Sequence, residues 1–140
     1  MGRSQAPDVP DRLILDAGAL IALARGDVHA RAFIERILVD EVLVEMPTPV
    51  LAQVHRGGHD RARTDRALRW IERFVPTSEH VARAAGELLA RSGLSDATDA
   101  IVAAEALAGT PAVVLTSDRK DIGRLVDADE AGRRVHVEPL

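Results

Sequence analysis

The stretch that decides the fold reads Leu13-Ile14-Leu15-Asp16-Ala17-Gly18-Ala19-Leu20-Ile21-Ala22-Leu23. It opens with three apolar residues in a row, which predicts a strand buried on both faces, as in parallel sheets. After Asp16 the apolar residues take helical spacing, so the chain passes from a strand into a helix at this aspartate. In open α/β sheets, ligands bind at the carboxyl ends of the strands. Asp16 is therefore a candidate site residue, and the alternative is that it only caps the helix that follows.

Bulk composition limits the class of protein. The length of 140 residues is typical of one domain, which we place at residues 12–140 after a flexible arm over residues 1–11. The hydrophobic content of 46% suffices for one core. Cysteine is absent, which excludes disulfides and thiolate chemistry. No apolar run is long enough to span a membrane, so we expect a cytoplasmic protein without a membrane partner. The net charge of -4 argues against nucleic-acid binding by overall positive charge, although six arginines gather between residues 55 and 73.

Strand and helix patterns alternate along the rest of the chain. Apolar runs predict further strands at 42–46, 112–115 and 134–137, with a short strand or connector at 75–76. Helical patterns and caps predict helices over 28–39, from an N-cap at Thr48 to 57–58, over 61–74, from an N-cap at Ser78 to 92, from Ser95 to 108, and over 118–126. This alternation predicts an α/β fold, a three-layer α/β/α sandwich around a mostly parallel sheet.

Acidic residues collect where these elements begin and end. Asp118 follows the strand at 112–115, and it shares a sheet edge with Asp16 if the two strands are neighbours. Asp96 and Asp99 share a face in the first turn of the helix after Ser95. Because that helix is rich in alanine and valine, we expect Asp99 to be drawn toward the interior, where a carboxylate needs a cation or donors. No lysine or arginine lies between residues 91 and 119 to pair with it.

A metal ion is the economical partner for these carboxylates. Acids without histidine or cysteine ligands favour a hard cation, Mg²⁺ or Mn²⁺, and such ions support phosphodiester hydrolysis by a metal-bound water. Each acid also has a structural alternative: Asp96 complements a helix dipole, and Asp121 completes a capping pattern with Asp118. We expect Glu105 to be solvated, and Glu45 fits either a site or a strand role.

Four segments in series resemble the PIN-domain ribonucleases, above all the VapC toxins of bacterial VapBC toxin–antitoxin pairs. The segments are 15–23, 49–58, 85–89 with 95–100, and 116–122. The resemblance covers residues 12–126 and implies an α/β/α sandwich that cleaves structured RNA, tRNA or ribosomal RNA, with Mg²⁺. It also implies a homodimer and a cognate antitoxin that neutralises the enzyme.

Carried over to this sequence, the resemblance makes Asp16, Asp99 and Asp118 metal-binding catalytic acids, and it places Thr116 and Ser117 in the lining of the site. The second motif of the family usually has glutamate where this chain has Gln53. An amide oxygen can coordinate a metal or orient its water, but it supplies no charge.

Two questions follow from the resemblance. Gln53 stands where the family usually has a glutamate, and this leaves two alternatives. In the first, Asp96 or Asp121 compensates for the missing charge. In the second, the chain is a weak or inactive PIN-fold module that binds RNA or protein. Divalent-metal affinity separates these alternatives. The arginines Arg56, Arg61 and Arg63 would hold the phosphate backbone of RNA, unless the arginine-rich helix is only a solvated surface.

Overall fold

The computed structural model describes residues 10–140 apart from 57 and 59, so most of the arm predicted at residues 1–11 lies outside the described residues. In the described part, the strands are β1 (Arg12–Leu15), β2 (Leu43–Pro47), β3 (Arg73–Val75), β4 (Ala112–Thr116) and β5 (Val135–Pro139). The helices are α1 (Ala17–Ala24), α2 (Val28–Val39), α3 (Thr48–Val54), α4 (Arg61–Leu68), α5 (Glu79–Ser92), α6 (Ala97–Ala108) and α7 (Arg119–Asp127), with a 3₁₀ turn at Glu130–Arg134. None of these helices is long and apolar enough to cross a membrane.

The strands form one parallel sheet in the order β3-β2-β1-β4-β5. The central strand β1 pairs with both neighbours, with Leu13 opposite Val44 of β2 and opposite Val113 of β4. From β1 the chain winds outward to β2 and β3 on one side, and it later returns to β4 and β5 on the other. The strand order therefore reverses between β1 and β4, which is where α/β sheets of this kind bind ligands.

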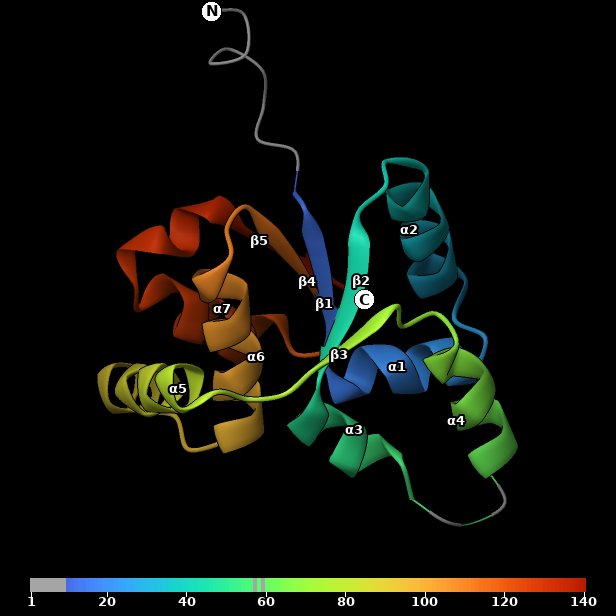
Figure 1. Cartoon of the computed structure of the whole chain (residues 1–140), viewed down its shortest axis with the longest axis horizontal. Helices are drawn as coiled ribbons and strands as arrows, with labels where there is room; N and C mark the ends of the chain where they lie inside the picture. Colours follow the sequence, from blue (N-terminus) through green and yellow to red (C-terminus); the bar gives the residue numbers. More distant parts are fainter. Residues whose placement is uncertain (1–9, 57, 59) are drawn as a thin grey trace, which may run out of the picture.

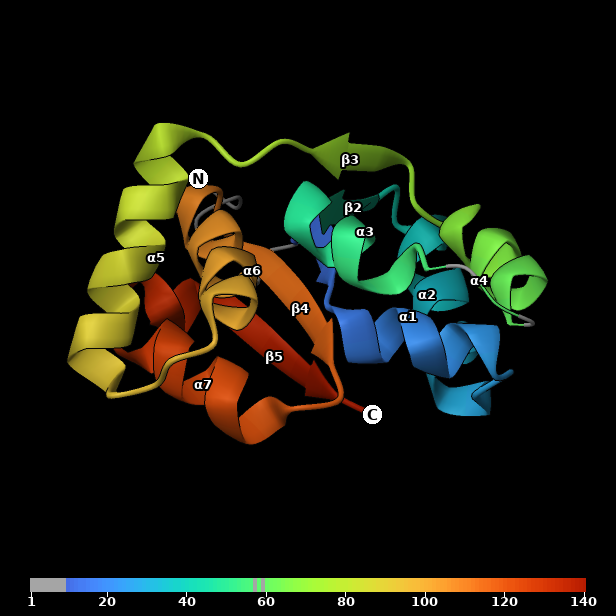
Figure 2. The ribbon, with the colours of Figure 1, turned by 90° about the horizontal axis from the view of Figure 1, so that it is seen from below.

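Helices cover both faces of the sheet (Figure 1). The first four helices lie on one side, and α5, α6 and α7 lie on the other, as the turned view in Figure 2 also shows. Leu13, Ile14 and Leu15 are fully buried between these layers. The predicted α/β/α sandwich is confirmed, and its sheet is parallel throughout the described strands.

The boundaries of several predicted elements differ from the structure, most clearly in three helices. The helix predicted over 61–74 ends at Leu68, because the chain turns and joins the sheet: the Glu72 amide donates to the Val44 carbonyl (2.9 Å), and the Glu72 carboxylate accepts from the Val44 amide (3.1 Å). Thr48 is the first residue of α3 and not its N-cap, and α3 ends at Val54. The N-cap of α6 is Asp96 and not Ser95, because only the Asp96 side chain accepts a hydrogen bond from the first turn.

Candidate metal centre

The carboxyl ends of β1 and β4 bring two aspartates to the same edge of the sheet. Asp16 directly follows β1, and its amide donates to the Leu115 carbonyl of β4. The buried Asp16 carboxylate accepts from the Ala19 amide (2.8 Å) and from the Thr116 hydroxyl (2.5 Å). The same hydroxyl accepts from the amide of Asp118 (2.8 Å). Thr116 thus links the end of β1 to the loop that follows β4.

A glycine permits this close approach of the two strand ends. A Cβ on Gly18, in the first turn of α1, would overlap the Ser117 side chain and would lie within van der Waals distance of the Asp16 carboxylate. Ser117 itself is exposed. Only glycine at position 18 therefore leaves room for the loop after β4 in this arrangement.

Each predicted site aspartate takes part in capping a helix, either through its side chain or through its backbone amide. Asp16 caps α1, Asp96 caps α6 by accepting from the Asp99 amide (3.0 Å), and Asp118 caps α7 by accepting from the Asp121 amide (3.1 Å). The capping that was the alternative for Asp16 is therefore observed, and Asp96 and Asp118 also cap helices, but capping does not exclude a site. A carboxylate has two oxygens and several lone pairs, so an oxygen that caps a helix leaves the other available.

Three carboxylates converge beside the strand ends. One oxygen each from Asp99, Asp118 and Asp121 lies within 4.8 Å of the other two, and no other group of three acids or histidines in the described residues meets this spacing. Asp99 comes from the first turn of α6, and the other two come from the start of α7. Asp121 is therefore a member of the cluster. Its position three residues after Asp118 places the two side chains on the same side of the helix start.

The cluster is short of positive charge. The pKa of Asp99 is raised to about 6, first by burial and then by the nearby carboxylates of Asp96, Asp16, Asp118 and Asp121, in that order of importance. Burial also raises the pKa of Asp16, although the hydrogen bonds from Thr116 and Ala19 oppose this effect. A cation among these oxygens would favour the charged form of both carboxyl groups and so oppose the effects of burial and of the neighbouring carboxylates.

The remaining predicted site residues lie around this cluster. Asp16 and Asp96 are its electrostatic neighbours, because their charges act on Asp99. Gln53 is exposed on α3, a helix that contacts both α1 and α6. Arg56, Arg61 and Arg63 are also exposed. Arg63 lines a groove with the C-terminal half of α1, at the opposite end of that helix from Asp16.

One sequence expectation about a carboxylate was wrong. Glu105, expected to be solvated, is 6% exposed on the buried face of α6. Its neighbours in sequence are alanine, valine and leucine on both sides, so the composition of the helix already indicated burial. What composition does not show is the partner of this carboxylate, the Arg12 guanidinium from the start of β1, whose Nη2 lies 4.0 Å from Glu105 Oε1.

Comparison with known proteins assigns the family. A family model for the PIN domain matches residues 13–127. The chain belongs to the PIN-domain family. A search of curated protein sequences gives no significant match.

Solved structures with the same PIN fold have low sequence identity to this chain. The chain is similar to a chain of VapBC2 from Rickettsia felis bound to a DNA fragment from their promoter, with a TM-score of 0.71, 17% identity, and coverage of 91% of this chain and 98% of that one. It is similar to a chain of DNA-bound VapBC from Salmonella typhimurium, with a TM-score of 0.66, 18% identity, and coverage of 91% and 97%. A toxin–antitoxin complex from Klebsiella pneumoniae has a TM-score of 0.62 at 22% identity, over 78% of this chain and 88% of that one. At these identities the likeness establishes the fold alone.

Proposed function

We propose that this PIN domain is a Mg²⁺-dependent endoribonuclease toxin of the VapC type. The observation that carries the proposal is the convergence of the Asp99, Asp118 and Asp121 carboxylates at the carboxyl edge of the sheet. Two findings support it: the chain belongs to a family that consists largely of nucleases, and its fold is similar to chains in toxin–antitoxin complexes.

The donor set fits a hard divalent ion. Oxygens bound to an octahedral Mg²⁺ at about 2.1 Å lie roughly 3 to 4 Å apart, and the three carboxylates need little movement to reach that spacing. Asp99, Asp118 and Asp121 would hold the ion, with Asp16 and Asp96 as further candidates, and Mn²⁺ would be accepted in its place. When bound, the ion supplies an activated water and charge stabilisation for phosphodiester hydrolysis.

The chain's own residues keep these acids in place. The Thr116 hydroxyl holds one oxygen of Asp16 and the Asp118 amide, so both acids are oriented before any ligand arrives. The Asp96 side chain holds the amide of Asp99 in the same way. Gln53 would orient a water or a phosphate oxygen through its amide, without adding charge to the cluster.

The substrate we propose is structured RNA, tRNA or ribosomal RNA, in the cytoplasm. Exposed Arg61 and Arg63 on α4, with Arg56 just before it, would bind the phosphate backbone. Asp16 and the groove that Arg63 lines lie toward opposite ends of α1. The eight residues of this helix have a length of about 12 Å. This span corresponds to about two nucleotides of backbone, so one strand could contact both places. Such contacts give affinity without base specificity.

We further propose a homodimer and a cognate antitoxin protein. An antitoxin that brings a cationic side chain to the cluster would relieve the repulsion that raises the pKa of Asp99. It would thereby compete with the metal for the same carboxylates.

The test is cleavage of total cellular RNA by antitoxin-free protein, with Mg²⁺ or with EDTA. We expect discrete fragments with 5′-phosphate ends that require Mg²⁺, that disappear in Asp99→Asn, and that persist in Asp40→Asn. Asp40 is a matched control because it is an exposed acid at the end of α2. Folded wild type that leaves RNA intact, and binds no divalent ion, would favour the inactive binding module instead.

A further inference from the structure

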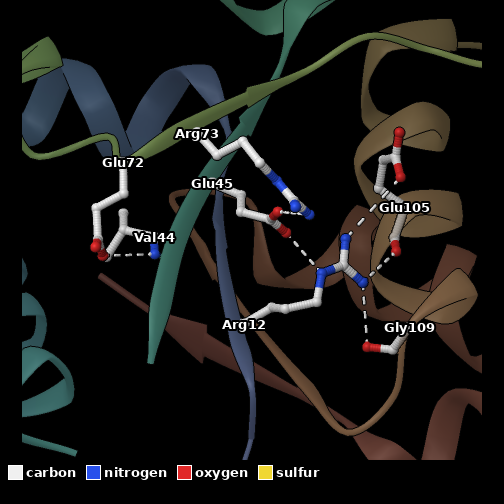
Figure 3. Close-up of polar contacts among 7 residues, drawn as sticks. All are labelled: Arg12, Val44, Glu45, Glu72, Arg73, Glu105 and Gly109. Carbon is white, nitrogen blue, oxygen red and sulfur yellow. Dashed lines mark hydrogen bonds and ion pairs between the residues drawn. The ribbon is translucent and has the colours of Figure 1, made fainter. Parts of the chain in front are cut away.

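A second group of charges links β1, β2 and β3 to the C-terminal end of α6 (Figure 3). At its centre is Glu45 of β2, whose side chain is fully buried. One oxygen of Glu45 accepts from Arg12 Nε over 2.6 Å, and the other forms an ion pair with Arg73. Because removing charges from water is costly, such a pair contributes little to net stability. The ion pairs of Glu45 instead fix the relative positions of the strands that carry these three side chains, β1, β2 and β3.

The Arg12 guanidinium also binds the end of α6. Its Nη1 donates to the Glu105 carbonyl (2.9 Å) and to the Gly109 carbonyl (3.1 Å). These carbonyls belong to the C-terminal end of the helix, where backbone acceptors lack helical partners and where a cation is favourable. Arg12 therefore joins the start of β1 to the last turn of α6, as Figure 3 shows.

The fit between this guanidinium and the helix end is close. A Cβ on Gly109 would overlap Nη1 of Arg12, so a larger residue here would displace the end of the arginine side chain from these carbonyls. Glu45 holds the guanidinium from the opposite side. Arg12 is thus fixed by contacts on the strand and on the helix.

The rest of α6 packs against α5, α7 and the sheet largely through small side chains. Four of its buried residues are alanines: Ala100, Ala103, Ala104 and Ala106. Small side chains form shallow ridges, so packing alone resists sliding of this helix weakly. Directed hydrogen bonds to its last turn resist sliding strongly, because small shifts break them.

The same helix carries Asp99 in its first turn. Asp99 and Glu105 are six residues apart, which is about 9 Å of continuous helix. If the C-terminal end of α6 shifts along the helix axis, Asp99 therefore moves by the same distance. Asp118 and Asp121 belong to a different element, the start of α7, so a shift of α6 relative to α7 changes their distance from Asp99.

We propose that Arg12, held by Glu45, is a positioning residue that fixes α6 along its axis and so sets the distance of Asp99 from Asp118 and Asp121. The proposal rests on the proposed function only in treating these three acids as a metal centre. The positioning itself can be measured without any metal.

The first test measures the distance between α6 and α7 directly. The chain has no cysteine, so Ala97→Cys and Lys120→Cys place one spin label at the start of each helix, both at exposed positions. Dipolar EPR is then recorded in the otherwise wild-type protein and with Arg12→Met, Gly109→Ala or Ile34→Val. Ile34→Val is the matched control, because it trims a buried side chain on α2, on the opposite face of the sheet. We expect a shifted or broadened distance distribution with Arg12→Met and Gly109→Ala only, and the same distribution in all four proteins would overturn the proposal.

The second test measures the consequence for metal binding, in unlabelled proteins under conditions where all are folded. We expect the Kd for Mn²⁺ to rise about tenfold or more in Arg12→Met and in Gly109→Ala, and to stay unchanged in Ile34→Val. A residue that only stabilised the fold would lower the unfolding midpoint without changing this Kd, and that result would also overturn the proposal. If wild type binds no Mn²⁺, the proposed function fails, while the spin-label distances still decide the role of Arg12.

Discussion

Replacing Asp99 with asparagine should stabilise the metal-free protein at neutral pH. The pKa of Asp99 is raised from 3.8 to about 6, chiefly by burial and then by the neighbouring carboxylates. A shift of this size corresponds to about 3 kcal/mol, at 1.36 kcal/mol for each pKa unit. Because Asp99 is only half-buried and solvent screens its charge, we expect about 1 to 2 kcal/mol. An asparagine has nearly the same shape and does not experience this cost.

The pH dependence gives the sign of the effect. A carboxyl group whose pKa is raised in the folded state stabilises the fold fully below its unfolded pKa of 3.8. That contribution is lost as the pH rises through about 6. The gain from Asp99→Asn should therefore be near zero at pH 3.5 and complete by pH 7.5.

The assay is urea unfolding in EDTA at several pH values, for wild type, Asp99→Asn and the exposed control Asp40→Asn. Adding Mg²⁺ at pH 7.5 should then reverse the order, because only a protein that binds the ion gains stability from it. If Asp99→Asn is no more stable than wild type in EDTA at pH 7.5, the reasoning from carboxylate repulsion is refuted.

Three other substitutions test separate parts of the site. Thr116→Val should lower the free energy of unfolding in urea by about 1 to 3 kcal/mol, because it leaves an oxygen of buried Asp16 without its donor. Thr116→Ser keeps the hydroxyl and should retain most of this free energy. An unchanged unfolding midpoint in the valine variant would contradict the role of the hydroxyl. Gly18→Ala should lower the unfolding midpoint by overlap with Ser117, and Ser117→Gly should rescue it; absence of rescue would show that the overlap is not the cause. Arg63→Ala should weaken RNA binding and reduce the salt dependence of log K by about 0.7 to 0.9, with the Mn²⁺ affinity unchanged; a variant with wild-type salt dependence would remove this arginine from the interface.

Local patterns predicted most of what positions the site. The apolar run before Asp16 and the run before Thr116 indicated two buried strands, and the parallel pairing of β1 with β4 meets the condition that the two are neighbours. Asp121 was predicted either to complete a capping pattern with Asp118 or to compensate for Gln53, and its carboxylate does join the cluster.

Contacts between distant segments were less accessible to sequence reasoning. The helix predicted through residue 74 ends early because β3 pairs with β2, and helical spacing cannot reveal that competition. The apolar neighbours of Glu105 indicated its burial, but they did not reveal that its carboxylate pairs with Arg12, at the start of a strand far away in the chain. Periodicity indicates which face of an element is buried, but it does not indicate which charged residue lies opposite.

The most direct test of the metal centre is a Mn²⁺ titration followed by EPR, with wild type, Asp121→Asn and Asp40→Asn. We predict saturable binding by wild type and by the Asp40 variant, and clearly weaker binding when Asp121 is changed. Equal binding by all three proteins, or none by wild type, would contradict a metal site at Asp99, Asp118 and Asp121.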